Sequence, residues 1–256
     1  MVDLWQSLLP EALSSFDFIL LIIVSIFTSA ITAAFGVGGG ATLLALMANI
    51  LPASAVIPVH GVVQLGSNTG RLLTMRKFIH WRMTLWFIGG CAVGSLIGGQ
   101  IAVSIPKNRL QVILGSFILV MCWEPFKIKA IRDRSSFLLG GVTSFLAMFV
   151  GVTGIFVIST LKHIIEDRRE LIGTMAAMMM FQHLSKCVVF FVLGFSFSDW
   201  GWLIVLMIAS GFIGTLLGRN LLNRMSNQGF GTAIKILITV LALRLLYTGI
   251  TSTING

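Results

Sequence analysis

The chain has 256 residues, of which 56% are hydrophobic and 11% charged, and its mean hydropathy is +0.97. This composition lies far outside the range of soluble domains and leaves no room for a separate catalytic domain. The net charge of +9 does not indicate nucleic-acid binding, because Lys and Arg gather at the ends of apolar segments, where they set membrane orientation. We therefore interpret the sequence as an all-α polytopic membrane protein.

Apolar segments follow one another along the whole chain, and the second and seventh are too short to span a bilayer. A single helix over residues 16–51 would be about 54 Å long, well beyond a hydrocarbon core of about 30 Å. The chain must break there, and the glycines of Gly36-Val37-Gly38-Gly39-Gly40 mark the break. The predicted segments are 16–35, 39–51, 54–75, 83–104, 108–123, 136–150, 154–165, 170–194, 200–219 and 230–250.

The second half of the chain resembles the first. Thr28-Ser29 and the following Gly36-Val37-x-Gly39 correspond to Thr143-Ser144 and Gly151-Val152-x-Gly154 at a shift of 115. Gln64 and Ser67 correspond to Gln182 and Ser185 at a shift of 118, and Gly90, Gly94 and Gly98 to Ser210, Gly214 and Gly218 at 120. Three landmarks in the same order predict an internal duplication, with repeats at 1–125 and 126–256 within one membrane domain.

The basic loops predict the orientation of the repeats. Four clusters of Lys and Arg belong on the cytoplasmic side, and the acidic N-terminus and the Ser198-Asp199 turn then face outward. Each half must cross the membrane an odd number of times, so we expect two inverted repeats, each a Gly-broken helix pair followed by three spanning helices. Whether each broken pair is a re-entrant hairpin or two short spans stays open.

The ordered pattern resembles the sulfite exporter TauE/SafE family over essentially the whole chain. The resemblance rests on the glycine stretch after a first apolar segment, a short helix to Pro52, a basic loop closing on His80-Trp81-Arg82, and a glycine-spaced third helix. The degenerate second copy at Gly151-Val152-Thr153-Gly154 fits as well. The resemblance implies a multi-pass transporter of the inner membrane that moves sulfite, sulfonate or related sulfur-containing anions, often as an exporter.

The glycine break has a chemical interpretation of its own. Glycines allow the chain to turn and expose backbone N–H groups, while the helix that begins near Gly39 directs its positive dipole end at the same place. Such a site favours an anion. Close helix packing is the alternative, and we prefer packing for the glycines spaced by four at Gly90, Gly94, Gly98, Gly214 and Gly218.

Polar residues in the helices after each break extend this candidate site. His60, Gln64, Ser67 and Arg71 share one helical face, with Asn68 alongside; we assign Arg71 to the basic loop instead. In the second half Lys186 is either a counter-charge for the anion or a side chain that snorkels to the interface. The candidate substrate-binding residues are Gly36, Gly38, Gly39, Gly40, His60, Gln64, Ser67, Asn68, Gly151, Thr153, Gly154, Gln182, Ser185 and Lys186.

The predicted spans contain no Asp or Glu, so the carboxylate relay of many proton-coupled pumps is missing. No His, Cys or Ser pairing of an intramembrane enzyme or metal site is present, and we predict no catalytic residue and no cofactor. The expected partners are a small anionic substrate and the lipid bilayer, with a homodimer permitted by the glycine faces. The alternatives are an anion channel and a non-transporting membrane assembly protein.

Overall fold

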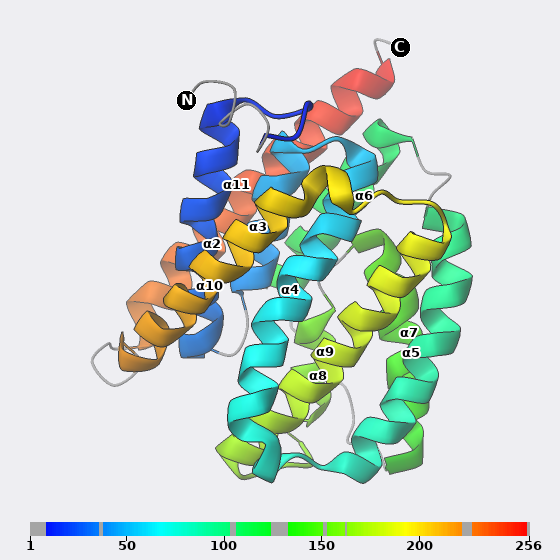
Figure 1. Ribbon diagram of the computed structural model, residues 1–256, viewed down its shortest axis with the longest axis vertical. Helices are drawn as coiled ribbons and strands as arrows, with labels where there is room; N and C mark the ends of the chain where they lie inside the picture. Colours follow the sequence, from blue (N-terminus) through cyan, green and yellow to red (C-terminus); the bar gives the residue numbers. More distant parts are fainter. Residues whose placement is uncertain are drawn as a thin grey trace.

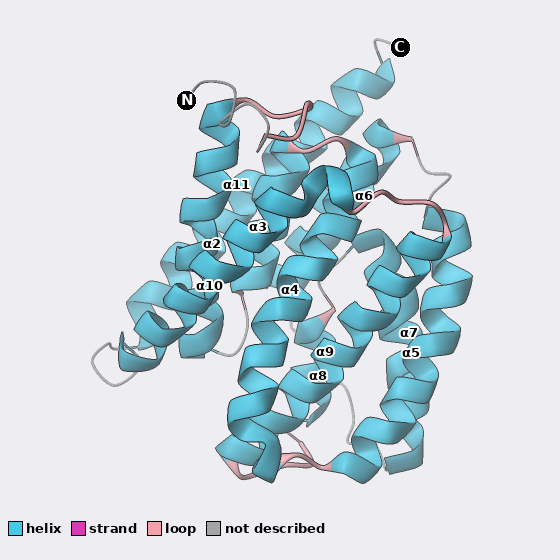
Figure 2. Ribbon diagram, viewed as in Figure 1, coloured by secondary structure: helices cyan, strands magenta, loops and turns pink. Residues whose placement is uncertain are grey.

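A computed structural model describes residues 9–35, 38–102, 106–123, 133–150, 153–161, 163–221 and 227–254. These residues are almost entirely helical and include no strand (Figure 2). Short 3-10 turns η1 (Arg76–Phe78), η2 (Asp133–Ser135) and η3 (Ser198–Trp200) connect some of the helices. The helices are α2 (Ser15–Phe35), α3 (Gly39–Ile50), α4 (Ala53–Met75), α5 (Trp81–Ala102), α6 (Lys107–Trp123), α7 (Ser136–Val150), α8 (Gly154–Leu161), α9 (Arg168–Val192), α10 (Gly201–Leu221) and α11 (Asn227–Ile254).

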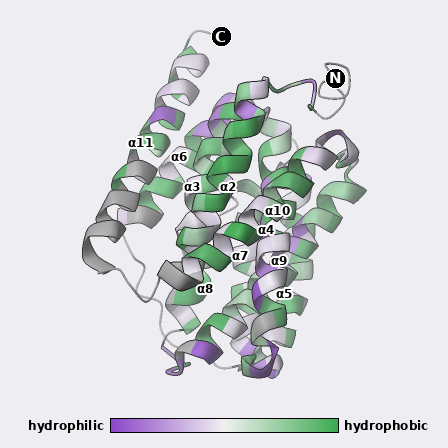
Figure 3. Cartoon of the chain, turned by 60° about the vertical axis from the view of Figure 1, so that its left-hand side comes forward, coloured by the Kyte–Doolittle hydropathy of each residue, from purple (hydrophilic) through white to green (hydrophobic). Residues whose placement is uncertain are grey.

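The outer faces of these helices are apolar, as a bilayer requires. Leu, Ile, Val and Phe side chains are exposed along α2, α5, α10 and α11, and Figure 3 shows hydrophobic residues along the length of the bundle. Of the described helical segments, four are long and apolar enough to cross a membrane. They are Ser15–Ala33, Trp81–Ile101, Arg169–Val192 and Ser198–Gly218. The predicted class, an all-α polytopic membrane protein, is confirmed.

The helix ends agree closely with the predicted segments, with one correction. The seventh segment was expected to reach residue 165, but α8 ends at Leu161 and His163 and Ile164 form a turn. With 12 and 8 residues, α3 and α8 are about 18 and 12 Å long, so neither spans a core of about 30 Å. Gly36 and Gly151 lie outside the described residues.

Two parallel helix pairs join the halves of the chain through glycines. On α5, a Cβ at Gly90 or Gly94 would collide with a carbonyl group of α7, that of Phe137 or Gly141. On α10, Gly214 and Gly218 lie in the same way against the carbonyl groups of Ile26 and Ala30 on α2. The packing role predicted for these glycines is confirmed. Because these faces are covered within the chain, they give no support to the homodimer.

Two antiparallel pairs complete the bundle (Figure 1). In the first, α4 lies against α9, with Gly61 beside Lys186 and Gly173 beside the Met75 carbonyl. In the second, α6 lies against α11, where Asn108 Nδ2 donates to Thr253 Oγ1 over 3.0 Å and Trp123 Nε1 donates to Thr239 Oγ1 over 2.9 Å. All four pairs combine a helix from before residue 124 with one from after residue 132, so the two parts of the chain interlock.

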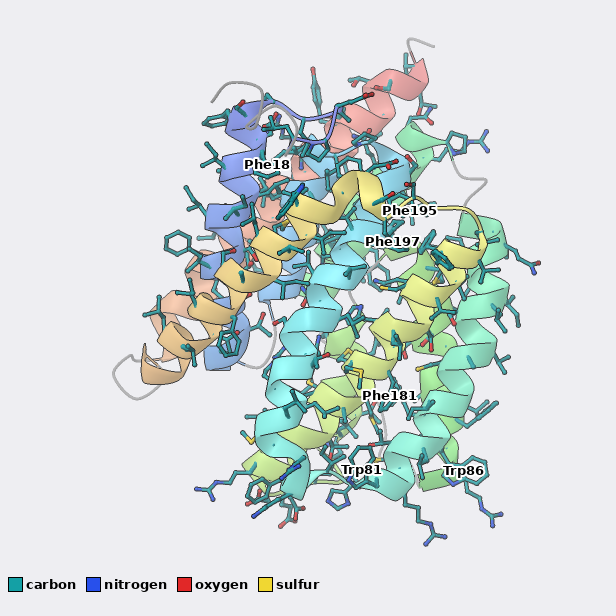
Figure 4. All side chains as sticks on the ribbon, viewed as in Figure 1. Phe18, Trp81, Trp86, Phe181, Phe195 and Phe197 are labelled. Carbon is teal, nitrogen blue, oxygen red and sulfur yellow. The ribbon has the colours of Figure 1, made fainter. Side chains whose placement is uncertain are left out.

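The two ends of the bundle differ in chemistry. At one end the loop after α4 is tied to the start of α9, where His80 Nε2 lies 2.8 Å from Glu170 Oε2 and the His80 N–H donates to Thr174 Oγ1 over 3.0 Å. Trp81 and Trp86 lie at this end, and Phe195 and Phe197 lie toward the other (Figure 4). Tryptophans at a membrane–water boundary are typical of membrane proteins.

Candidate functional site

A cavity of about 60 Å³ lies where the start of α3, the polar face of α4, the start of α8 and the middle of α9 converge. A cavity of this size holds a few water molecules or one small anion. Its polar lining comes mostly from the first half of the chain, and its apolar lining from the second. The lining residues are Thr32, Gly38, Gly40, Ala41, His60, Gln64, Asn68, Arg71, Gly154, Ile155, Met175, Met179 and His183.

The start of α3 presents backbone donors to this cavity. Gly38 caps the helix with φ 102° and ψ −44°, a conformation that only glycine adopts easily. The first bond within the helix is Thr42 N–H to the Gly38 carbonyl over 3.0 Å. The N–H groups of Gly39, Gly40 and Ala41 therefore have no acceptor in the helix. Together with the helix dipole, they make the place suited to negative charge.

The two glycines that open α3 have different surroundings. A Cβ at Gly39 would collide with the Thr28 carbonyl and the Thr32 hydroxyl, so Gly39 lets α3 approach α2 closely. A Cβ at Gly40 would instead meet the Gln64 side-chain nitrogen at 2.7 Å. Gly39 is thus a packing residue, whereas Gly40 keeps room for the amide of Gln64 beside the cavity.

His60 and Gln64 form a polar contact that leaves donors available. His60 Nε2 lies 3.1 Å from the Gly40 carbonyl oxygen and 3.2 Å from Gln64 Nε2. One ring nitrogen cannot donate to the carbonyl and accept from the amide at once. In the tautomer in which Nε2–H donates to Gly40, both amide hydrogens of Gln64 remain free to bind a ligand in the cavity.

The same face of α4 continues to Arg71. Asn68 Nδ2 donates to the Gln64 carbonyl over 2.8 Å, and an Arg71 guanidinium nitrogen donates to Asn68 Oδ1 over 2.9 Å. The assignment of Arg71 to the basic loop was wrong, because it lies in α4 and lines the cavity. The spacing of Arg71 from His60, Gln64 and Ser67 was the signal that could have placed it there.

The second break is closed by the chain's own side chains. Gln182 accepts from Thr153 Oγ1 over 2.9 Å and donates to Thr143 Oγ1 and Ser144 Oγ over 3.0 and 3.1 Å. Gln182 is only 1% exposed and does not line the cavity, although Gly154 does. The two breaks therefore differ: the amide of Gln64 borders the cavity, while the amide of Gln182 is occupied.

Lys186 is entirely buried, which excludes the snorkelling alternative. A Cβ added to Gly61 of α4 would lie 2.9 Å from Lys186 Cε and 3.7 Å from its Nζ. Among the residues that the structure describes, the ammonium has no hydrogen-bond partner, nor do the Nδ1 atoms of His60 and His183. A buried cation without a partner is costly, so it marks a place where a negative ligand is favoured.

The structure thus brings together part of the predicted set. Gly38, Gly40, His60, Gln64, Asn68 and Gly154 line the cavity, while Gly39, Ser67, Thr153, Gln182, Ser185 and Lys186 do not. His183, which is not among the predicted site residues, lies in the lining, and its ring centroid is 6.2 Å from that of His60. Met175 and Met179 line the cavity too. No sequence signal identified them, because their positions depend on how α9 packs against α4.

The fold and this cavity define the class of protein: a multi-pass membrane protein with a cavity, lined in part by polar side chains, between interrupted helices, an arrangement that solute transporters use. The profile of the sulfite exporter TauE/SafE family matches residues 21–245, and the chain belongs to this family of membrane transporters. No curated protein and no solved structure matches the chain.

Proposed function

We propose that the chain is a secondary transporter of the inner membrane that exports sulfite, a sulfonate or a related sulfur-containing anion by alternating access. The observation that carries the proposal is the cavity at the start of α3, with the backbone of Gly40 and Ala41 on one side and Gln64 on the other. Sulfur oxyanions are hydrogen-bond acceptors, so N–H donors at a positive helix end suit them.

The pairing of the helices supports a two-fold relation between inverted halves. The contacts between α5 and α7 have counterparts between α10 and α2. Gly94 of α5 packs against Gly141 of α7, and the corresponding residue Gly214 of α10 packs against Ile26 of α2, which corresponds to Gly141. The antiparallel pairs α4–α9 and α6–α11 each join corresponding helices of the two halves. Rocking of such halves about a shared cavity exposes it to each side in turn.

An inside-negative membrane potential favours outward movement of an anion, at about 2.3 kcal/mol per charge per 100 mV. Export of an anion therefore needs no carboxylate relay, and the membrane-embedded cations Arg71 and Lys186 lie near the proposed route.

Anion flux into and out of liposomes that contain the purified chain tests the proposal. We expect sulfite or a short alkylsulfonate to show saturable counterflow in the native protein. We expect Lys186→Met and Gln64→Ala to lose most of that flux while they keep the native helical circular-dichroism spectrum.

Matched controls keep the result specific. Lys77→Met removes an exposed lysine of η1, and Gln100→Ala an exposed glutamine of α5, and both should transport normally. Full flux in Lys186→Met and Gln64→Ala would contradict the assigned site. Flux without counterflow would favour the anion channel, and no flux of any anion would favour the assembly protein.

A further inference from the structure

A second cavity, of about 400 Å³, lies at the opposite end of α4 from the basic loop. Ser54 and Gly194 in its wall are exposed, so this cavity opens near Phe195. Figure 4 shows Phe195 toward the end of the bundle opposite Trp81 and Trp86. The wall is mostly apolar and combines α4, α6, α7 and the end of α9. The lining residues are Ala53, Ser54, Ile57, Pro58, Leu110, Met148, Phe190, Leu193, Gly194 and Phe195.

A thin layer that contains Gly61 and Lys186 separates the two cavities. One helical turn from this layer toward the basic loop, Gln64 and His183 line the first cavity. One turn in the other direction, Ile57 and Phe190 line the second cavity. The span of α9 from His183 to Phe190 is about 10 Å long at 1.5 Å per residue. Along the axis of α9, Lys186 therefore lies only a few ångströms from a lining residue of each cavity.

Pro58 lies inside α4 beside this layer. Proline has no N–H, so the carbonyl of Ser54, four residues earlier, has no intrahelical donor. That carbonyl and the Ser54 hydroxyl give the wall of the second cavity polar groups that can bind water. A proline is also a common place for a helix to bend, which lets the first turns of α4 move relative to the rest.

We propose that the second cavity is the vestibule on the opposite face of the membrane and that Lys186 is an intermediate anion site between the chambers. This inference rests on the proposed transport function. An anion that leaves the donors of α3 and Gln64 meets the Lys186 ammonium next. The ammonium attracts anions into the layer and repels cations, so the step is selective for charge.

The experiment is one-sided labelling of single cysteines with a membrane-impermeant, cationic methanethiosulfonate reagent. The background chain has Cys91, Cys122 and Cys187 replaced by alanine. Asn68→Cys reports on the first cavity and Ser54→Cys on the second, each in right-side-out and in inside-out membrane vesicles. We expect Asn68→Cys to react only from the side of the basic loops and Ser54→Cys only from the other side. The control Val205→Cys is exposed on α10 toward lipid and should react from neither side.

A second arm tests Lys186 with the same reporters. In the background chain we expect Lys186→Met to leave the labelled sides unchanged while sulfite counterflow falls at least tenfold, and Lys186→Arg to keep part of the flux. Labelling of both reporters from one side would overturn the assignment of the vestibules. Full flux in Lys186→Met would overturn the intermediate site. If the native chain moves no anion, the proposed function fails, yet the labelling still decides whether the cavities face opposite sides.

Discussion

Gly39 and Gly40 are neighbours at the start of α3, but an added methyl group meets different atoms at each position. At Gly39 the obstacle is the Thr28 carbonyl, which is backbone and cannot rotate away. At Gly40 it is the end of the Gln64 side chain, which can move but only by leaving its place beside the cavity. One glycine therefore supports the fold and the next supports the site.

We expect Gly39→Ala to destabilise the protein by about 1–3 kcal/mol, the usual cost of overpacking. Gly40→Ala should leave stability within about 1 kcal/mol of the native value but lower sulfite flux about tenfold, as loss of one hydrogen bond to a charged ligand does. Thermal unfolding in detergent and flux in liposomes measure the two effects separately. Equal losses of stability in both variants would contradict this division of roles.

Gln182 joins three elements of the second half at one buried point. Its amide links Thr153 before α8 with Thr143 and Ser144 of α7. Thr153 corresponds to Gly38 at the shift of 115, so the first half has no hydroxyl at that place. The amide of Gln182 therefore has a hydroxyl partner at this position, whereas the amide of Gln64 lies beside the cavity.

We expect Gln182→Ala to lower stability by about 2 kcal/mol, because hydrogen bonds between membrane helices contribute about 0.6 kcal/mol each. Thr153→Val removes one of the three bonds and should lower stability by about a third as much. Gln64→Ala should have little effect on stability. Thermal unfolding of the three variants in one detergent gives the comparison, and an unfolding temperature for Gln182→Ala close to the native one would refute the structural role.

At the scale of the helices, α5 and α7 lie so close together that their backbones are in contact. We expect Gly94→Ala, whose methyl would meet the Gly141 carbonyl, to destabilise the bundle by about 1–3 kcal/mol. Gly201→Ala is the matched control, because no atom lies within 4 Å of the added Cβ. Its effect should stay within about 0.5 kcal/mol. Thermal unfolding measures the stability of both variants. A native unfolding temperature for Gly94→Ala would mean that α5 and α7 can move apart at no cost in free energy.

The helices themselves could be predicted from the sequence because their signals are local. Apolar runs, the glycine breaks and basic ends fix where α2 to α7 begin and end. The pairing of helices is not local. Nothing near Met175 or Met179 in the sequence indicates that they meet Gly40 across a cavity. The sequence also could not predict whether Lys186 is buried, because its short distance from the helix end is compatible with snorkelling. Its burial depends on the packing of α4, whose Gly61 lies beside it.

At the scale of the whole molecule, the main contacts cross between the halves. On α4, Gly61 meets Lys186 of α9, and on α6, Asn108 bonds to Thr253 of α11. A helix of one half covers the polar or glycine face of a helix from the other. Neither half, alone in a bilayer, would satisfy these faces. We therefore expect the proposed repeats at 1–125 and 126–256 to be units of sequence that fold only together.

This interlocking predicts the behaviour of a divided chain. We expect fragments 1–125 and 126–256, produced together, to assemble into a complex that co-purifies and transports sulfite, because the cut leaves each of the described helices whole. Each fragment produced alone should be degraded or aggregate, since its glycine and polar faces then lie open to lipid. A pair cut within α5 at Val93 is the control and should not assemble, because the interrupted helix cannot pack along α7. Either half folding and transporting alone would show that the contacts between α5 and α7 and between α2 and α10 are dispensable.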